Sequence, residues 1–100
     1  MSQDTDHDFL DRAHEHLRIA NQQLEDVSEG QVSASMMYAC ARFNAWVSAS
    51  NQDSARNLKS AYGETIEYFV AQYRRMLVKN LDDFVANFGE YIKRPTDKSS

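Results

Sequence analysis

Residues 62–88 read YGETIEYFVAQYRRMLVKNLDDFVANF, and this stretch decides the fold. Its apolar residues recur every three or four positions, which is the spacing of one face of an α-helix. The pattern continues on both sides and comprises Leu58, Tyr62, Ile66, Phe69, Tyr73, Met76, Asn80, Phe84, Phe88 and Tyr91. A second row widens this face and consists of Val70, Leu77, Leu81 and Val85. Because residues 53–92 contain no proline, we expect one helix of about 38 residues, roughly 57 Å long.

Two shorter helices, each of roughly 20 residues, are predicted before it. The first has one apolar stripe, made of Leu10, Ala13, Leu17, Ala20, Leu24 and Val27. The second, over residues 32–50, is apolar nearly all round and carries one charge, Arg42, so we expect a central helix that is buried on several sides. Its start has two readings. Ser28 and Gln31 fit a capping box, but Gly30 could instead end the first helix and move the start to Ser33.

These helices predict an all-α fold in which a helical hairpin packs on a long C-terminal helix. The fold has three helices, or four if the last one breaks near Asn80. A hairpin about 30 Å long cannot cover a helix of roughly 57 Å, so we favour a continuous helix whose overhang pairs with a second copy. The predicted interface of this homodimer consists of Leu77, Leu81, Phe84, Phe88 and Tyr91. We expect a single domain over residues 7–92, with disordered ends at 1–6 and 93–100.

Composition narrows the class of protein. The 100 residues include 15 acidic and 11 basic side chains, for a net charge of -4, which argues against a general nucleic-acid binder. One cysteine excludes an internal disulfide and any multi-cysteine zinc site. The N-terminus has no secretory pattern and no stretch is long and apolar enough to span a membrane. We therefore expect a cytoplasmic protein.

Two dense segments resemble a known family. Residues 38–46 read YACARFNAW and residues 68–84 read YFVAQYRRMLVKNLDDF. Together with residues 11–13 (DRA) and 19–21 (IAN), they are similar to a family of uncharacterised proteobacterial proteins, domain of unknown function 3144. The resemblance covers roughly residues 8–92. It implies a bacterial, cytoplasmic, all-helical protein, and it supplies no activity, substrate or functional residue.

The sequence contains few residues that could bind a metal ion or act as a catalytic nucleophile. The histidines are His7, His14 and His16, and Asp11 with His14 has the spacing of a carboxylate–histidine metal pair on a helix. Glu64 and Glu67 could face that pair, but four-helix metal sites need more ligands than these. We expect surface histidines and no bound metal. Cys40 lies in an apolar stretch, so we expect a structural residue and not a nucleophile.

Arg42 is the single charge of the apolar helix and a candidate binding residue. An unpaired buried arginine is costly, so it needs an acid partner or an exit to the helix edge. Glu64 or Glu67 could supply the acid, with the hydroxyls of Tyr38 or Tyr68 completing the network. The functional alternative is an anion site between helices, made of Tyr38, Arg42, Glu67 and Tyr68.

These patterns are compatible with three functions. We favour a small non-catalytic helical interaction module that forms a homodimer, with no cofactor and with a further protein partner left open. The alternative is an enzyme or a small-molecule or metal-binding bundle, with its site around Arg42 and Glu67. The weakest is a nucleic-acid regulator that uses the basic residues Arg74, Arg75 and Lys79. No catalytic constellation is recognisable, so we lean away from an enzyme.

Overall fold

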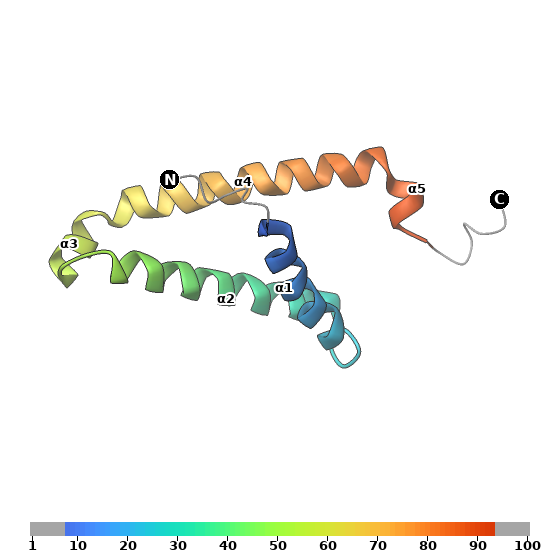
Figure 1. Ribbon diagram of the computed structural model, residues 1–100, viewed down its shortest axis with the longest axis horizontal. Coiled ribbons are helices and arrows are strands. Elements are labelled where there is room, and N and C mark those ends of the chain that lie inside the picture. The colour runs from blue at the N-terminus through green and yellow to red at the C-terminus, as the bar shows by residue number, and fades with distance from the viewer. Residues whose placement is uncertain (1–7, 94–100) are drawn as a thin grey trace. The chain divides into compact units, whose positions relative to one another are not determined.

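The computed structural model describes residues 8–93, and these residues form helices and no strands. The all-α prediction is therefore confirmed. The helices are α1 (Phe9–Gln23), α2 (Glu29–Ser50), α3 (Ala55–Ser60), α4 (Tyr62–Ala86) and α5 (Phe88–Tyr91) (Figure 1). They fall into two units, of which the first ends at Asn51 and the second begins at Gln52. The predicted disordered ends, apart from Lys93, lie outside the described residues.

The first unit is a hairpin in which α1 runs back beside the N-terminal part of α2 (Figure 1). α2 begins with a complete capping box. The backbone N–H of Gln31 donates to the Ser28 hydroxyl over 3.2 Å, and the N–H of Ser28 donates to the Gln31 side-chain oxygen over 3.0 Å. These two bonds satisfy N–H groups that a helix start leaves without partners. Gly30 thus lies inside α2, and the capping-box reading of the start is confirmed.

The hairpin buries little apolar surface. Within the described residues, Val32 of α2 is the one buried hydrophobic side chain. Half-buried positions continue along α2 at Met36, Asn44, Val47 and Ser48, and face it on α1 at Phe9, Ala13 and Ala20. The more covered side of α2 thus includes Val32 and Met36 but not Phe43 or Trp46. Val32, Met36 and Val47 form the apolar part of this more covered side, and Asn44 and Ser48 form its polar part.

Phe43 and Trp46 instead lie on an exposed side of α2. Each is 62% exposed, and their ring centroids are 5.7 Å apart. Tyr38 and Met37 are exposed as well. The prediction that α2 is buried on several sides is therefore wrong for its own unit, because α1 is only 15 residues long and covers a limited part of α2.

The second unit contains α3, α4 and α5, and the predicted single helix over residues 53–92 is interrupted twice. Ala61 separates α3 from α4, with φ -92° and ψ 7°, just before Gly63. Asn87 separates α4 from α5, with φ -123° and ψ 28°. The helix does not break at Asn80. There the side-chain Nδ2 donates to the carbonyl oxygen of Met76 over 2.8 Å, and the helix continues.

These interruptions shorten the long helix. α4 has 25 residues and α2 has 22, which correspond to about 37 and 33 Å. The single straight helix of roughly 57 Å that was expected to extend beyond the hairpin is therefore not formed, and its extra length gives no reason for a dimer. A dimer would instead have to bury the side chains that α4 leaves exposed.

The capping box gives a test of what holds α2. We expect Ser28→Ala to lower the free energy of unfolding by about 1 kcal/mol, because an N–H at the helix start loses its acceptor. Urea unfolding followed by circular dichroism measures this loss. Ser35→Ala is the matched control, since the Ser35 hydroxyl only donates back to the Val32 carbonyl within the helix, and it should change stability by less than about 0.5 kcal/mol. Equal losses in both variants would contradict the assignment.

Candidate functional site

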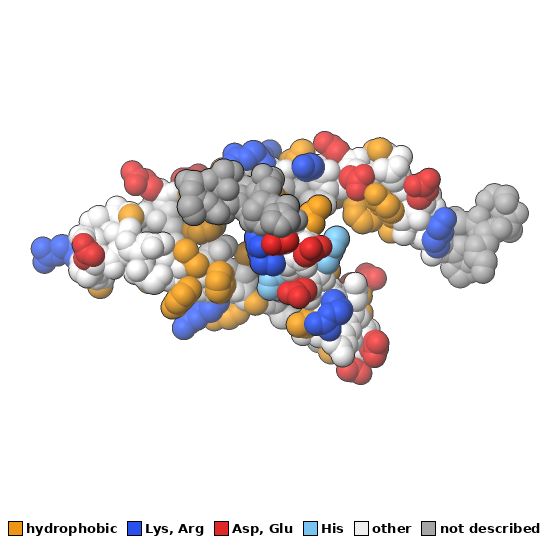
Figure 2. Space-filling view, viewed as in Figure 1, with side chains coloured by type: hydrophobic (Ala, Val, Ile, Leu, Met, Phe, Trp, Pro, Cys, Tyr) orange, Lys and Arg blue, Asp and Glu red, His pale blue; other side chains and the backbone are white. Residues whose placement is uncertain are grey.

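One side of α4 is apolar and exposed along its whole length. We call it the α4 face, and its exposed members are Tyr62, Ile66, Val70, Tyr73, Met76, Leu77, Leu81 and Phe84. Phe69 lies on the same side and is half-buried. Figure 2 shows hydrophobic side chains at the surface of both α4 and α2. The other described helices of the second unit are too short to cover this face, since α3 has six residues and α5 has four.

The five residues predicted as a dimer interface all belong to this surface or to α5 beside it. Leu77, Leu81, Phe84, Phe88 and Tyr91 are between 42% and 55% exposed. Their exposure fits a surface that could meet a partner, and the interface itself stays a prediction.

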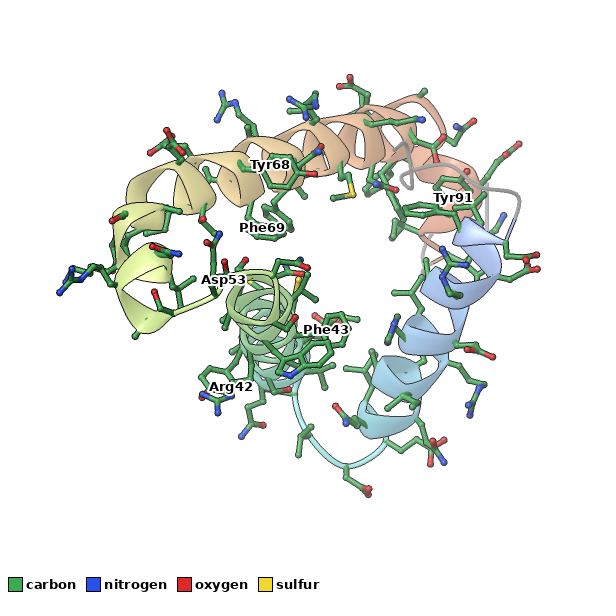
Figure 3. The ribbon with its side chains drawn as sticks, turned by 60° about the vertical axis from the view of Figure 1, so that its left-hand side comes forward. Arg42, Phe43, Asp53, Tyr68, Phe69 and Tyr91 are labelled. Atoms are coloured by element: carbon green, nitrogen blue, oxygen red, sulfur yellow. The ribbon has the colours of Figure 1, made fainter. Side chains whose placement is uncertain are left out.

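The end of α4 carries a polar clasp that positions α5. The Tyr91 hydroxyl donates to one carboxylate oxygen of Asp83 over 3.0 Å, and Asn87 Nδ2 donates to the other over 2.9 Å. Nδ2 of Asn87 also reaches the Asp83 carbonyl at 3.1 Å. The rings of Phe84 and Tyr91 meet edge to face, with centroids 4.8 Å apart. Figure 3 shows Tyr91 turned back beside the end of α4.

Asp83 also changes the acidity of Tyr91. The hydrogen bond to Asp83, and then the negative charge of that carboxylate, raise the pKa of the Tyr91 hydroxyl above its ordinary value of 10.0. Sequence reasoning missed this clasp. The signal was present, because Asp83, Asn87 and Tyr91 succeed one another at intervals of four residues, which places them on one side of a helix.

The candidate binding residues Tyr38 and Arg42 lie one turn apart on α2, and both are exposed. Arg42 and Phe43 leave α2 in different directions (Figure 3). Among residues 8–93 Arg42 has no ion-pair partner, and an exposed guanidinium does not need one. Its exposure within the first unit fits an exit to the helix edge, and a pair with Glu64 or Glu67 of the second unit stays a prediction.

Glu67 and Tyr68 are consecutive residues of α4, and both are exposed. Gln72 Nε2 donates to the Tyr68 hydroxyl over 3.0 Å, and Arg75 Nη2 donates to the Gln72 side-chain oxygen over 2.6 Å. The Tyr68 ring also meets that of Phe69 edge to face, at 5.1 Å. Tyr68, Gln72 and Arg75 thus form a polar edge beside the α4 face. A combined site with Tyr38 and Arg42 stays a prediction.

The remaining candidate residues do not gather into a centre. His14 and His16 are exposed on α1, whereas His7 lies outside the described residues. Within residues 8–93, no three histidine, cysteine or acidic side chains come close enough to hold a metal ion. Cys40 is exposed, and Asn44 Nδ2 approaches its sulfur at 3.4 Å. No described helix is long and apolar enough to cross a membrane.

The fold and this surface define a small all-helical protein whose longest helix leaves an apolar side open. The chain belongs to the DUF3144 family of proteins of unknown function, which it matches over residues 9–85. The predicted family resemblance is therefore confirmed. α5 and the residues Asn87 and Tyr91 of the clasp lie beyond the matched segment.

A solved structure supports this membership. The chain is 33% identical to the protein NB7890A from Shewanella sp., known from an NMR structure, with a TM-score of 0.74. The similarity covers 89% of this chain and 95% of that one. No curated protein matches the chain.

The clasp predicts a titration. Because the Tyr91 pKa is raised, the contact with Asp83 is complete below pH 10 and is lost as the pH rises through the pKa of folded Tyr91. Loss of the phenolic proton removes the donor and sets two negative charges against each other. We expect Asp83→Asn to lower the Tyr91 pKa. The pKa is measured by following, as the pH is raised, the NMR chemical shift of the Tyr91 ring carbon that carries the hydroxyl. Asp82→Asn is the control, and a pKa that falls equally in both variants would contradict the clasp.

Proposed function

We propose that this protein is a non-catalytic helical interaction module that forms a homodimer through the α4 face and α5. One observation carries the proposal. Most large hydrophobic side chains of the described residues are exposed, and Val32 alone is buried. Apolar surface in water costs about 25 cal/mol per Å². A contiguous exposed apolar surface on a small protein is typical of a binding interface.

A second copy of the chain is a suitable occupant because it carries the same surface. In a two-fold symmetric dimer one patch meets its own copy, so an apolar helix side is complementary to itself. The five interface residues are close to half exposed. If large side chains carry roughly 200 Å² each, their burial removes about 470 Å² per copy, more than half of the ~800 Å² per partner in a standard interface.

The borders of the α4 face support the same proposal. Tyr73 and Met76 extend the apolar surface toward the N-terminus of α4, at 51% and 48% exposure. On one side the hydrogen-bonded edge of Tyr68, Gln72 and Arg75 remains polar. An apolar centre with a polar, solvated rim is the usual composition of a protein–protein interface.

We also propose that the protein acts in the bacterial cytoplasm. Its structural relative comes from Shewanella sp., and a chain with a single cysteine suits a reducing compartment. The dimer needs no disulfide, metal or cofactor, because apolar burial supplies the association free energy.

A charge on the α4 face tests the dimer. We expect Leu81→Glu to convert the dimer into a folded monomer, because pairing would bury an unpaired carboxylate. Light scattering coupled to size-exclusion chromatography gives the mass, and circular dichroism checks the helix content. Leu81 suits this test because it is 55% exposed and lies outside the clasp. Phe84→Glu should act in the same direction, with an added loss of the contact to Tyr91.

The matched control is Ala86→Glu. Residue 86 is exposed and lies on α4 two positions from Phe84, about 200° away around the helix. The Ala86→Glu variant carries the same added negative charge, but at a position outside the α4 face. We therefore expect it to remain a dimer. A wild-type chain that runs as a monomer at high micromolar concentration, with its helices intact, would overturn the proposal.

A further inference from the structure

The five residues of the proposed dimer interface are spaced as one side of a single helix. Intervals of four, three, four and three residues separate Leu77, Leu81, Phe84, Phe88 and Tyr91, which we call the interface line. With 3.6 residues per turn, a continuous helix keeps all five within a sector of about 80°. In the structure α4 ends at Ala86, and α5 turns away from its direction (Figure 1). Phe88 and Tyr91 therefore do not continue the row that the first three residues begin.

The backbone itself does not force the break at Asn87. Residues 84–92 contain no proline, and none of the described residues has a positive φ. Asn87 Nδ2 donates to the Asp83 carbonyl over 3.1 Å, and Asn80 makes the same bond to Met76 in the middle of a continuous helix. The side chain of Asn87 is thus compatible with a bent helix and with a continuous one.

Tyr91 is the residue that holds the bent form. Its hydroxyl donates to Asp83 over 3.0 Å, and its ring centroid lies 4.8 Å from that of Phe84. In a continuous helix Tyr91 would lie about 10.5 Å beyond Phe84 and about 12 Å beyond Asp83 along the axis, so both contacts would open. The pKa of Tyr91, which Asp83 raises, therefore belongs to the bent form.

We propose that the clasp restrains dimer formation: the single chain keeps α5 folded back, and pairing opens the clasp and joins α4 and α5 into one continuous helix. This inference rests on the proposed homodimer and describes how it is regulated. The open form presents the whole interface line on one side, where a second copy can bury it. A partner that binds the open form better shifts the chain toward that form, and the closed fraction lowers the apparent affinity.

The surroundings of the interface line decide which form is stable. In a single chain, opening exposes the rings of Phe84 and Tyr91 to water and gives up the hydrogen bond to Asp83. In the dimer the second copy covers both rings, so burial of the whole line offsets this loss. Asp83 lies about 120° from Leu77 around α4, outside the line, so its released carboxylate stays in water.

Tyr91→Phe tests the clasp through the affinity of the dimer. The variant keeps the ring that the dimer buries and loses the hydroxyl that closes the clasp. We expect the dimer dissociation constant, measured by analytical ultracentrifugation, to fall about tenfold, because the closed form of each copy loses a hydrogen bond. An unchanged or a weaker dimer would overturn the inference.

Tyr68→Phe is the matched control. It also removes a hydroxyl of a hydrogen-bonded tyrosine, since the Tyr68 oxygen accepts from Gln72, but this residue lies outside the clasp and the interface line. We expect its dimer dissociation constant to equal that of the wild type. A tenfold fall in both variants would show that the clasp is not the cause and would contradict the inference.

The backbone ¹³C chemical shifts of Asn87 report the bend directly. In the monomeric variants Leu81→Glu and Leu77→Glu they should be non-helical, as expected for φ -123° and ψ 28°, and Asp83→Asn should lower the Tyr91 pKa in either background. In the wild-type dimer they should become helical, like those of Asn80 in every sample. A dimer that keeps non-helical shifts at Asn87 would overturn the inference and leave the homodimer intact. A wild-type chain that stays monomeric at high micromolar concentration would overturn the proposed function and this inference together.

Discussion

The apolar side of α4 is the constraint on which the rest of the structure depends. A helix of 25 residues with Tyr, Ile, Met, Leu and Phe along one side has to remove that side from water. Within its own unit α4 has only two short helices beside it among the described residues. The free energy of burying this surface must therefore come from contacts outside the second unit. This need is the physical basis of the association proposed above.

The helices themselves are fixed mainly by local hydrogen bonds at their ends. Ser28 and Gln31 start α2, and the Ser54 hydroxyl accepts from the Asn57 N–H to start α3. Asp83, Asn87 and Tyr91 hold the last turn. Each of these contacts joins residues that are three to eight positions apart. Such contacts form without a large core, so secondary structure and exposed apolar surface coexist in one small chain.

This local character explains what the sequence could predict. Helix type, the start of α2 and the apolar side of α4 are all set by spacing within a few residues. The extent to which α2 is covered was not, because its apolar residues lie nearly all round the helix, whereas Val32 and Met36 are covered and Phe43 and Trp46 are exposed. The exposure of Arg42 and Cys40 has the same cause. An almost apolar sequence predicts burial only if enough partner surface exists, and 15 residues of α1 do not provide it.

Asn80 and Asn87 show why residue type alone could not locate the helix end. Each donates its Nδ2 to the carbonyl four residues earlier, yet the helix continues at Asn80 and stops at Asn87. The residues on the C-terminal side of each asparagine make the difference. Beyond Asn87, Tyr91 returns to Asp83 and Phe84, and this contact stabilises a separate turn. Beyond Asn80, Leu81 and Phe84 continue the apolar side, so the amide stays within it.

A polar group kept inside an apolar surface loses less when its partner is an identical group than when its partner is a hydrocarbon. Asn80 is such a group, because Met76 and Phe84 lie one turn before and after it on the α4 face. A purely apolar partner would leave its side-chain oxygen without a donor, whereas a second amide supplies one. The position of Asn80 therefore favours a partner surface that supplies a hydrogen-bond donor there over a purely apolar one.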